Sequence, residues 1–248
     1  MRLPRPLPFP RLPRWLKRLV LLGVVLLGIG FLLRLIPKRP LSSDVPLSTA
    51  VYDRDRRLLR LTLAEDEQYR LWVPLQEISP TLIEAVLLHE DRHFYHHFAV
   101  NPVALGRALW MTYVSRERRV GGSTISMQVA RMKYHLQSRS AAGKLRQIVR
   151  ALWLELRYSK AEILEAYLNL VPVGKNIQGV AAASFVYFGK PVAKVQLGEA
   201  LTLAVIPQSP ARRAPSGDDT QALQKARAGL FQKWVARHPA AQRDAELR

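Results

Sequence analysis

One glutamate in the sequence could serve two incompatible chemistries. Glu90 lies in the segment His89-Glu90-Asp91-Arg92-His93. Two histidines four positions apart on one face of a helix, with a glutamate beside the first, form the pattern with which zinc proteases hold their metal and their base. The alternative is that Glu90 is a metal-free carboxylate base at a helix end, where the aromatic residues that follow bury and the acid points into a groove.

The surrounding residues disfavour the zinc chemistry. Asp91 and Arg92, between the two motif histidines, are charged although such a helix should be packed against the protein. No third-ligand signature follows, neither His-x-x-Gly-x-x-His nor Glu-x-x-x-Asp one helix later. His96 and His97 lie on the connection after the motif, where contact with solvent explains them equally well. We therefore expect no metal site, and polar contacts at a helix end for the histidines.

A second segment has the composition of a site for oxyanions or sugar hydroxyls. Residues 121–128 read Gly-Gly-Ser-Thr-Ile-Ser-Met-Gln. The glycine pair is flexible, the start of a helix presents backbone N–H groups, and two hydroxyls add donors and acceptors. On its own, such a segment is usually an ordinary loop and helix cap. Its meaning depends on what accompanies it in the chain.

The hydrophobic periodicity predicts a mainly α domain with a few short strands near its N-terminus. Ser79-Pro80 is a favourable pair for a helix start, and apolar residues at helical spacing follow it up to Glu90. Ser159, with Glu162 three positions later, forms a capping box. The expected strands are 50–52, 58–62 and 69–73, and the expected helices are 79–90, 102–110, 123–134, 144–157, 159–170 and 220–237.

An apolar run near the N-terminus predicts one membrane-spanning helix. Residues 19–36 are apolar or glycine apart from Arg34, and as a helix they would extend about 27 Å, enough to cross a bilayer if Arg34 reaches the headgroups. A cleaved signal peptide is the alternative, but no small-residue cleavage pattern follows. Six basic residues precede the run and three lie at or after its end, so the positive-inside rule predicts a cytoplasmic N-terminus.

The net charge predicts an anionic partner. The chain has 38 Lys and Arg against 19 Asp and Glu, a formal net charge of +19. Nucleic acid, anionic lipid headgroups and a phosphate-bearing substrate would all satisfy that charge. Everything after the membrane helix is expected on the periplasmic side of the plasma (inner) membrane, so we expect no nucleic acid as partner. The absence of cysteine excludes disulfides and thiolate metal sites.

Three blocks of residues together resemble the family 51 peptidoglycan glycosyltransferases, in their order and spacing as well as their composition. The blocks are Glu90-Asp91-x-x-Phe94-x-x-His97, then Gly121-Gly122-Ser123-Thr124-Ile125-Ser126-x-Gln128, and then Tyr158-Ser159-Lys160-x-Glu162-Ile163-Leu164-x-x-Tyr167-Leu168-Asn169. Residues 187–190 and 203–210 extend the likeness to about residues 45–212. Residues 100–102 and 143–147 look most like the 1C type of class A penicillin-binding proteins.

The resemblance implies a lysozyme-like, two-lobed glycosyltransferase domain at residues 49–212. We expect it to follow a basic cytoplasmic tail (1–18), the membrane helix (19–36) and a linker (37–48), and to precede a polar tail with one candidate helix (213–248). Proteins of the 1C type usually carry a transpeptidase domain next, and this chain stops before one could begin. It therefore resembles a monofunctional version or a fragment, and a separate transpeptidase is a candidate partner.

The resemblance also implies a reaction, the polymerisation of lipid II into β-1,4 glycan strands with inversion and release of undecaprenyl pyrophosphate. Glu90 matches the family's base, and the partners are lipid II, the lipid-linked nascent glycan and the membrane. A divalent cation such as Mg²⁺ or Mn²⁺ could assist, but no cofactor is expected to be required. The residues expected to bind substrate, several of them cations suited to phosphate, are Asp91, Arg107, Gly122, Ser123, Thr124, Gln128, Arg131, Arg139, Lys144, Arg146 and Gln147.

Three positions depart from the family pattern. Gln147 stands where many members have a second glutamate, although this glutamine belongs to the 1C-type pattern. Met127 replaces a common glutamine, and Ala99 replaces a usual glycine, which is tolerable only if the backbone there does not need a positive φ. Gln147 keeps open a second function class, a catalytically weak, membrane-anchored scaffold that binds lipid-linked glycan. The apolar residues expected to touch the bilayer are Trp110, Met111, Tyr113 and Val114.

Overall fold

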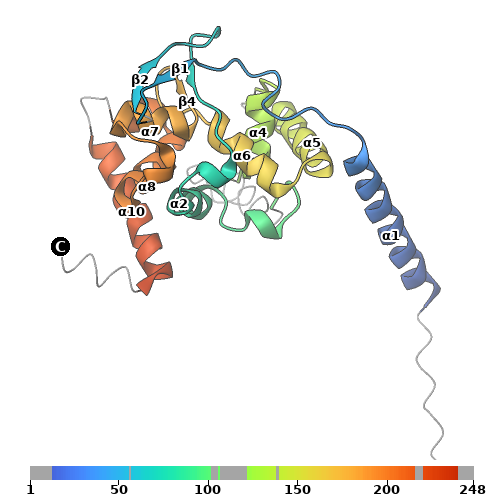
Figure 1. Cartoon of the computed structure of the whole chain (residues 1–248). Helices are drawn as coiled ribbons and strands as arrows, with labels where there is room; N and C mark the ends of the chain where they lie inside the picture. The colour runs from blue at the N-terminus through green and yellow to red at the C-terminus, as the bar shows by residue number, and fades with distance from the viewer. Residues whose placement is uncertain are drawn as a thin grey trace, which may run out of the picture. The chain divides into compact units, whose positions relative to one another are not determined.

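The computed structural model describes residues 13–55, 57–101, 106, 122–137, 140–215 and 220–239. The chain divides into two units, residues 1–38 and residues 39–248. The first contains helix α1 (Arg14–Leu35), blue in Figure 1, which is long and apolar enough to cross a membrane. It ends where Ile36 takes an extended conformation before Pro37, as a residue that precedes proline prefers. The expected apolar helix near the N-terminus is confirmed, and it begins before the apolar run.

Four short strands form two small sheets in the second unit. β1 (Ala50–Tyr52) pairs antiparallel with β2 (Leu58–Leu61), and β3 (Tyr69–Arg70) pairs parallel with β4 (Ile177–Gln178). The buried Arg70 side chain links β3 to β4. Its guanidinium donates to Gln178 Oε1 at 2.6 and 3.0 Å and to Asp66 Oδ2 at 2.8 Å. The expected strands near the N-terminus are confirmed, whereas β4 was not predicted.

One group of helices packs around α4 (Ile125–Lys133), with α5 (Ala141–Arg157) and α6 (Lys160–Leu170) against it (Figure 1). Each helix begins at a residue whose hydroxyl accepts a backbone N–H, namely Thr124, Ser140 and Ser159. The capping box of Ser159 and Glu162 is confirmed. Seven of the eleven residues of α6 are buried, so this helix forms the centre of the domain.

A second group consists of α2 (Pro80–Glu90), α8 (Leu197–Val205) and α10 (Gln221–Arg237), which pack on one another. Helix α7 (Val180–Phe188) contacts both α6 and α8, so it joins the two groups, which correspond to the two expected lobes. The mainly α fold with few short strands is confirmed. The remaining elements are η1 (Leu75–Glu77), η2 (Phe94–His96), η3 (Val192–Lys194), η4 (Ile206–Gln208) and α9 (Pro210–Arg213).

The helix starts and their caps differ in part from the expected ones. α5 begins at Ala141, three residues before the expected start, because Ser140 caps it. α2 begins after Ser79 as expected, but the Ser79 hydroxyl donates to the Val195 carbonyl at 3.2 Å and does not cap the helix. α4 begins two residues later than expected, because Thr124 rather than Ser123 accepts the N–H of Met127 at 3.3 Å. The expected helix 102–110, with Arg107, Arg139 and the four apolar residues expected at the bilayer, lies outside the described residues.

Helix α10 belongs to the body of the domain. It matches the expected helix at 220–237, but its Leu223, Leu230 and Trp234 side chains are buried and it packs on α2 and α8. The second unit includes this helix as well. We therefore place α10 within the domain rather than in a polar tail that begins at residue 213.

Ala99 corrects one expectation. The sequence predicts a backbone without a positive φ at this alanine, yet its φ is +53°. The side chain is fully buried, and the Ala99 carbonyl accepts a hydrogen bond from Thr124 Oγ1 at 2.5 Å. A left-handed backbone is unfavourable for alanine, since its Cβ crowds the following carbonyl. The contact with Thr124 is part of what holds the backbone in this conformation.

Candidate functional site

Glu90 ends helix α2 and meets the first turns of α4. Gln128 Nε2 donates to Glu90 Oε2 at 2.7 Å, so two of the three motifs found in the sequence come together at this carboxylate. The Glu90 side chain is only 6% exposed. Its other oxygen, Oε1, has no hydrogen-bond partner among the described residues. A buried carboxylate with one oxygen fixed and the other unsatisfied is poised to accept a proton.

Burial raises the pKa of the Glu90 carboxyl above its ordinary value. The amides of Gln128 and Gln208 and the charges of Arg131 and Arg213 lower the pKa without cancelling the effect of burial. A carboxylate with a raised pKa holds an accepted proton more strongly, which is what a general base working near neutral pH requires. The environment therefore suits Glu90 to base catalysis.

Asp91 links the same two motifs from the other side. Both of its carboxylate oxygens lie within 3.0 Å of His97 Nε2, and Oδ2 also accepts the backbone N–H of Ile125 at 3.1 Å, at the start of α4. The Asp91 side chain is 4% exposed. These contacts use its oxygens within the protein, so the structure favours a positioning role for Asp91 over direct contact with substrate.

Lys144, near the start of α5, contacts the residues that precede α4. Lys144 Nζ donates to Ser123 Oγ at 2.5 Å and lies 3.5 Å from Gln147 Oε1. Burial, followed by the charge of Arg131, lowers the pKa of Lys144. Because the pKa falls through removal of the ammonium from water and through a neighbouring cation, an anion bound between Lys144 and Arg131 would be stabilised by both cations. This part of the site is suited to a phosphate.

The structure brings together most, but not all, of the expected substrate residues. Gln128 and Arg131 lie on α4 close to Glu90, and Arg131 interacts electrostatically with both Glu90 and Lys144. The Thr124 hydroxyl is engaged in capping α4 and in the bond to Ala99, and Gly122 is half-buried in the loop that leads into Thr124. Arg146 is exposed on the outer side of α5, whereas its neighbour Gln147 is buried.

A buried polar network behind the site was not predicted. Glu155 accepts hydrogen bonds from Ser126 Oγ at 2.5 Å and from Lys160 Nζ at 2.6 Å. Lys160 Nζ also donates to the His97 carbonyl at 2.7 Å and lies 4.4 Å from the centre of the Phe94 ring. Helix α5 thus carries a buried acid two turns after Gln147, but its charge is matched by a lysine of the third motif. A signal for this network is present in the sequence, since Ser126 belongs to the second motif and Lys160 to the third.

Arg213 and Tyr167 also reach the surroundings of Glu90. Arg213, on α9, donates to the Val205 carbonyl at 2.8 Å and to Gln208 Oε1 at 3.2 Å, and its charge lowers the pKa of Glu90. Burial and the charge of Glu90 raise the pKa of Tyr167 well above its ordinary value, so the phenol stays neutral. Arg213 lies one residue beyond the segment that carries the family resemblance, and Tyr167 belongs to the third motif without a predicted role.

The zinc-protease interpretation fails on helix geometry. It requires His89 and His93 on one face of a continuous helix, but α2 ends at Glu90 and His93 is exposed in the following turn. Burial, followed by the charges of Lys233 and Arg213, lowers the pKa of His89 to about 4. His89 is therefore neutral near pH 7, and its largely buried ring lies beside Glu90, with Nε2 3.9 Å from Oε1.

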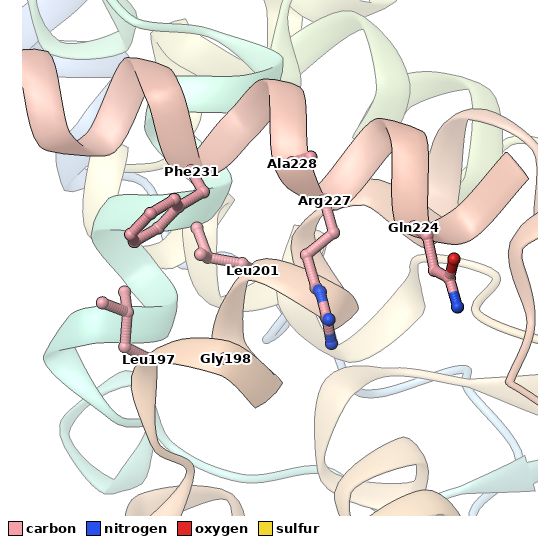
Figure 2. A pocket seen from close by; sticks show the side chains of 7 residues that line it. All are labelled: Leu197, Gly198, Leu201, Gln224, Arg227, Ala228 and Phe231. Atoms are coloured by element: carbon pink, nitrogen blue, oxygen red, sulfur yellow. The ribbon is translucent and has the colours of Figure 1, made fainter. Parts of the chain in front are cut away.

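The two described cavities lie away from Glu90. The larger, of about 540 Å³, is lined by Leu197, Gly198 and Leu201 of α8 and by Gln224, Arg227, Ala228 and Phe231 of α10 (Figure 2). The other, of about 390 Å³, lies where α2, η2 and Arg237 meet. Neither is lined by an expected site residue. The assignment of the site to Glu90 rests on the contacts of its carboxylate and not on cavity size.

Comparison with known proteins defines the class. The model of the transglycosylase family matches residues 56–235, which include Glu90, the whole of α4 to α8 and most of α10. The chain therefore belongs to the transglycosylase family.

Two curated relatives are penicillin-binding proteins. The chain is 44% identical to penicillin-binding protein 1C of Escherichia coli over 150 residues, covering 60% of this chain and 19% of the relative. It is 36% identical to penicillin-binding protein 1A of Aquifex aeolicus over 221 residues, covering 85% of this chain and 30% of the relative. The chain thus spans less than a third of either protein. A crystal structure of penicillin-binding protein 1A from Haemophilus influenzae matches with a TM-score of 0.42 and 20% identity, over 79% of this chain and 19% of that one.

Proposed function

We propose that the chain is a peptidoglycan glycosyltransferase that polymerises lipid II with Glu90 as the base. The observation that carries the proposal is the Glu90 carboxylate, which is buried and accepts a hydrogen bond from Gln128 at Oε2. Burial raises its pKa, and the charges of Arg131 and Arg213 oppose that rise in part. Membership of the transglycosylase family and similarity to penicillin-binding proteins support the same substrate class.

In the proposed reaction, the 4-hydroxyl of the acceptor's N-acetylglucosamine attacks the anomeric carbon of the lipid-linked donor. Glu90 takes the hydroxyl proton as the new C–O bond forms, and the bond between the anomeric carbon and the pyrophosphate oxygen breaks. The electron pair of that bond leaves with undecaprenyl pyrophosphate, and attack from the opposite face inverts the α linkage to β-1,4. Lys144 and Arg131 stabilise the charge that develops on the pyrophosphate.

Gln147 bears on the need for a divalent cation. The buried acids near α4 already have partners. Asp91 contacts His97, and Glu155 accepts a hydrogen bond from Lys160. Gln147 is neutral, and its Nε2 has no hydrogen-bond partner among the described residues. The N–H donors of the Gln147 amide suit a phosphate oxygen, whereas Mg²⁺ and Mn²⁺ need oxygen ligands. We therefore propose that no cofactor is required and that any assisting cation is held mainly by the pyrophosphate.

The proposed location follows from α1 and the charge distribution. The chain would be a single-pass protein of the plasma (inner) membrane with its N-terminus in the cytoplasm, and the domain would work on the periplasmic side, where lipid-linked glycan is its partner.

The alternative function is a membrane-anchored scaffold that binds lipid-linked glycan without polymerising it. Gln147, where many family members have an acid, is the observation that favours it. The two functions differ in one result, because a scaffold would bind lipid II and yield no polymer.

The test is a gel assay of lipid II polymerisation with the full-length chain in detergent. Glu90→Gln should abolish polymer while retaining the fold, because the amide cannot accept the proton. Glu84→Gln is the matched control, since Glu84 lies on the same helix and pairs with Arg237 and His238 at the surface. Polymer from Glu90→Gln at the wild-type rate would remove Glu90 from the base role. Lipid II binding without polymer by the wild type would establish the scaffold.

A further inference from the structure

His89 lies beside the proposed base but has no part in the proposed reaction. It precedes Glu90 at the end of α2, and its Nε2 is 3.9 Å from Glu90 Oε1. The two side chains are 11% and 6% exposed. Oε1 and both ring nitrogens of His89 have no hydrogen-bond partner among the described residues. Because buried polar atoms are nearly always paired, these neighbouring groups are the natural partners of each other.

A small movement would join the two groups. A nitrogen and an oxygen in a hydrogen bond lie about 2.9 Å apart, so the gap between His89 Nε2 and Glu90 Oε1 must shorten by about 1 Å. Hydrogen bonds at catalytic sites are often long in a ligand-free protein and tighten when substrate fills the site. A rotation of either side chain supplies a movement of this size.

The charges around His89 decide which group donates. Burial, the charge of Lys233 on α10 and the charge of Arg213 on α9 lower the pKa of His89 to about 4. The imidazole is therefore neutral near pH 7 and carries one N–H. An ionised carboxylate only accepts, so the pair is attractive when the hydrogen is on Nε2. His89 is then a neutral donor to Glu90 rather than the cation of an ion pair.

Gln208 on η4 supports this geometry. Its amide lowers the pKa of Glu90 and raises the pKa of His89 through hydrogen bonds, so it lies against both side chains. Arg213 donates to Gln208 Oε1 at 3.2 Å, which orients the amide. The other oxygen of the carboxylate accepts from Gln128 Nε2 at 2.7 Å. Oε1 therefore lies toward His89, and Oε2 lies toward α4.

We propose that His89 is a positioning residue for the base, because its Nε2–H donates to Glu90 Oε1 while Gln128 holds Oε2. A donor on each oxygen fixes the plane of the carboxylate and favours its ionised form. The other charged or titratable groups that face Glu90 are Arg131, Arg213 and Tyr167. The inference rests on the proposed function in its use of Glu90 as the base, whereas the contact itself requires no catalysis.

Two substitutions of His89 separate a hydrogen bond from packing. His89→Leu removes the donor and keeps an apolar side chain in the interior, whereas His89→Gln puts an amide N–H near the place of Nε2. In a lipid II assay between pH 5 and pH 9, His89→Leu should move the acid limb to higher pH and lower kcat at pH 6 about tenfold, with KM unchanged. His89→Gln should recover most of that loss.

His238 provides the matched control, because it makes a similar contact with another glutamate of the same helix. His238 Nε2 lies 3.3 Å from Glu84 Oε1, and the two side chains are 35% and 37% exposed. His238→Leu should leave kcat, KM and the acid limb as they are in the wild type. Thermal unfolding of the three variants verifies that each one folds.

Nitrogen chemical shifts test the contact without any reaction. The full-length chain is labelled with ¹⁵N in its histidines and measured in detergent, and the His89 signal is the one that His89→Gln removes. The signal should show a hydrogen on Nε2 and none on Nδ1 at pH 6 to pH 8. Glu90→Gln should change the Nε2 shift, because a charged acceptor becomes neutral, and Glu84→Gln should not.

Any of three results would overturn the inference. The first is a hydrogen on Nδ1 of His89 rather than on Nε2, and the second is an Nε2 shift that Glu90→Gln leaves unchanged. The third is an equal loss of rate at every pH in folded His89→Leu and His89→Gln proteins, which would assign His89 to packing. If His89→Leu does not fold, the nitrogen shifts decide. Absence of polymer from the wild type would refute the proposed function alone, because the nitrogen shifts would still decide the contact.

Discussion

Substitution of Gln128 should change the pKa of the Glu90 carboxyl. Gln128 Nε2 donates a hydrogen bond to Glu90 Oε2 at 2.7 Å, and this bond stabilises the ionised form. Gln128→Leu keeps the approximate volume and removes the donor. The pKa of Glu90 should then rise further, because burial remains while one of the groups that oppose it is lost.

The magnitude follows from the kind of bond. A hydrogen bond to a charged group contributes about 1.5–3 kcal/mol, and each 1.36 kcal/mol corresponds to a factor of ten. On the acid side of the pH profile, where the rate follows the ionised fraction of Glu90, Gln128→Leu should therefore lower the rate about 10- to 100-fold. At higher pH, where Glu90 is ionised in both proteins, the difference should narrow to any effect on substrate binding.

The assay is the initial rate of lipid II polymerisation between pH 5 and pH 9. Gln224→Leu, an exposed glutamine on α10, controls for the loss of an amide elsewhere. A folded Gln128→Leu protein whose acid limb coincides with that of the wild type would refute the reasoning, because the contact would then have no influence on the protonation of Glu90. A uniform loss at every pH would assign Gln128 to substrate binding instead.

Three further predictions concern charge and backbone. Glu90→Gln should stabilise the fold relative to the wild type increasingly as pH rises, because ionisation of a carboxyl whose folded-state pKa is raised destabilises the folded wild type. Chemical unfolding at pH 5 and pH 8 measures the effect, and an equal effect at both pH values would contradict the prediction. Lys144→Met should lower kcat/KM for lipid II about 10- to 100-fold, whereas the exposed Lys225→Met should not, and equal effects would exclude a specific phosphate contact. Ala99→Gly should destabilise the fold by about 2 kcal/mol less than Ala85→Gly: both lose a buried methyl, but glycine weakens helix α2 at position 85, whereas it relieves a left-handed alanine at position 99. Equal losses in thermal unfolding would refute this.

Local signals in the sequence predict α1, α2, α4, α5, α6 and α10, whereas α7 and α8 are not among the expected helices. The capping box of Ser159 and Glu162 depends on residues three positions apart, and the start of α2 depends on the fixed φ of Pro80. The parallel pair of β3 and β4 could not be predicted in this way. Arg70 and Gln178 are 108 positions apart, and each strand has only two residues, too few for any alternation.

The site shows the same division between local and distant contacts. Glu90 and Gln128 were recognised from their motifs, but only the fold shows that one donates to the other. Asp91 contacts both Ile125 and His97, and Arg213 on α9 lowers the pKa of Glu90. These interactions arise from tertiary packing. Ala99 illustrates a further limit, because the strain of its left-handed backbone is imposed by its surroundings and the residue type argues against it.

The central claim is that Glu90 accepts the proton of the attacking sugar hydroxyl. The measurement that tests it most directly is a single-turnover rate of glycan bond formation from lipid II, with wild type and Glu90→Gln compared at equal occupancy by substrate. A rate lower by about 10²- to 10⁴-fold in the variant, with lipid II binding unchanged, is the predicted result. An unchanged rate at equal occupancy would contradict the account.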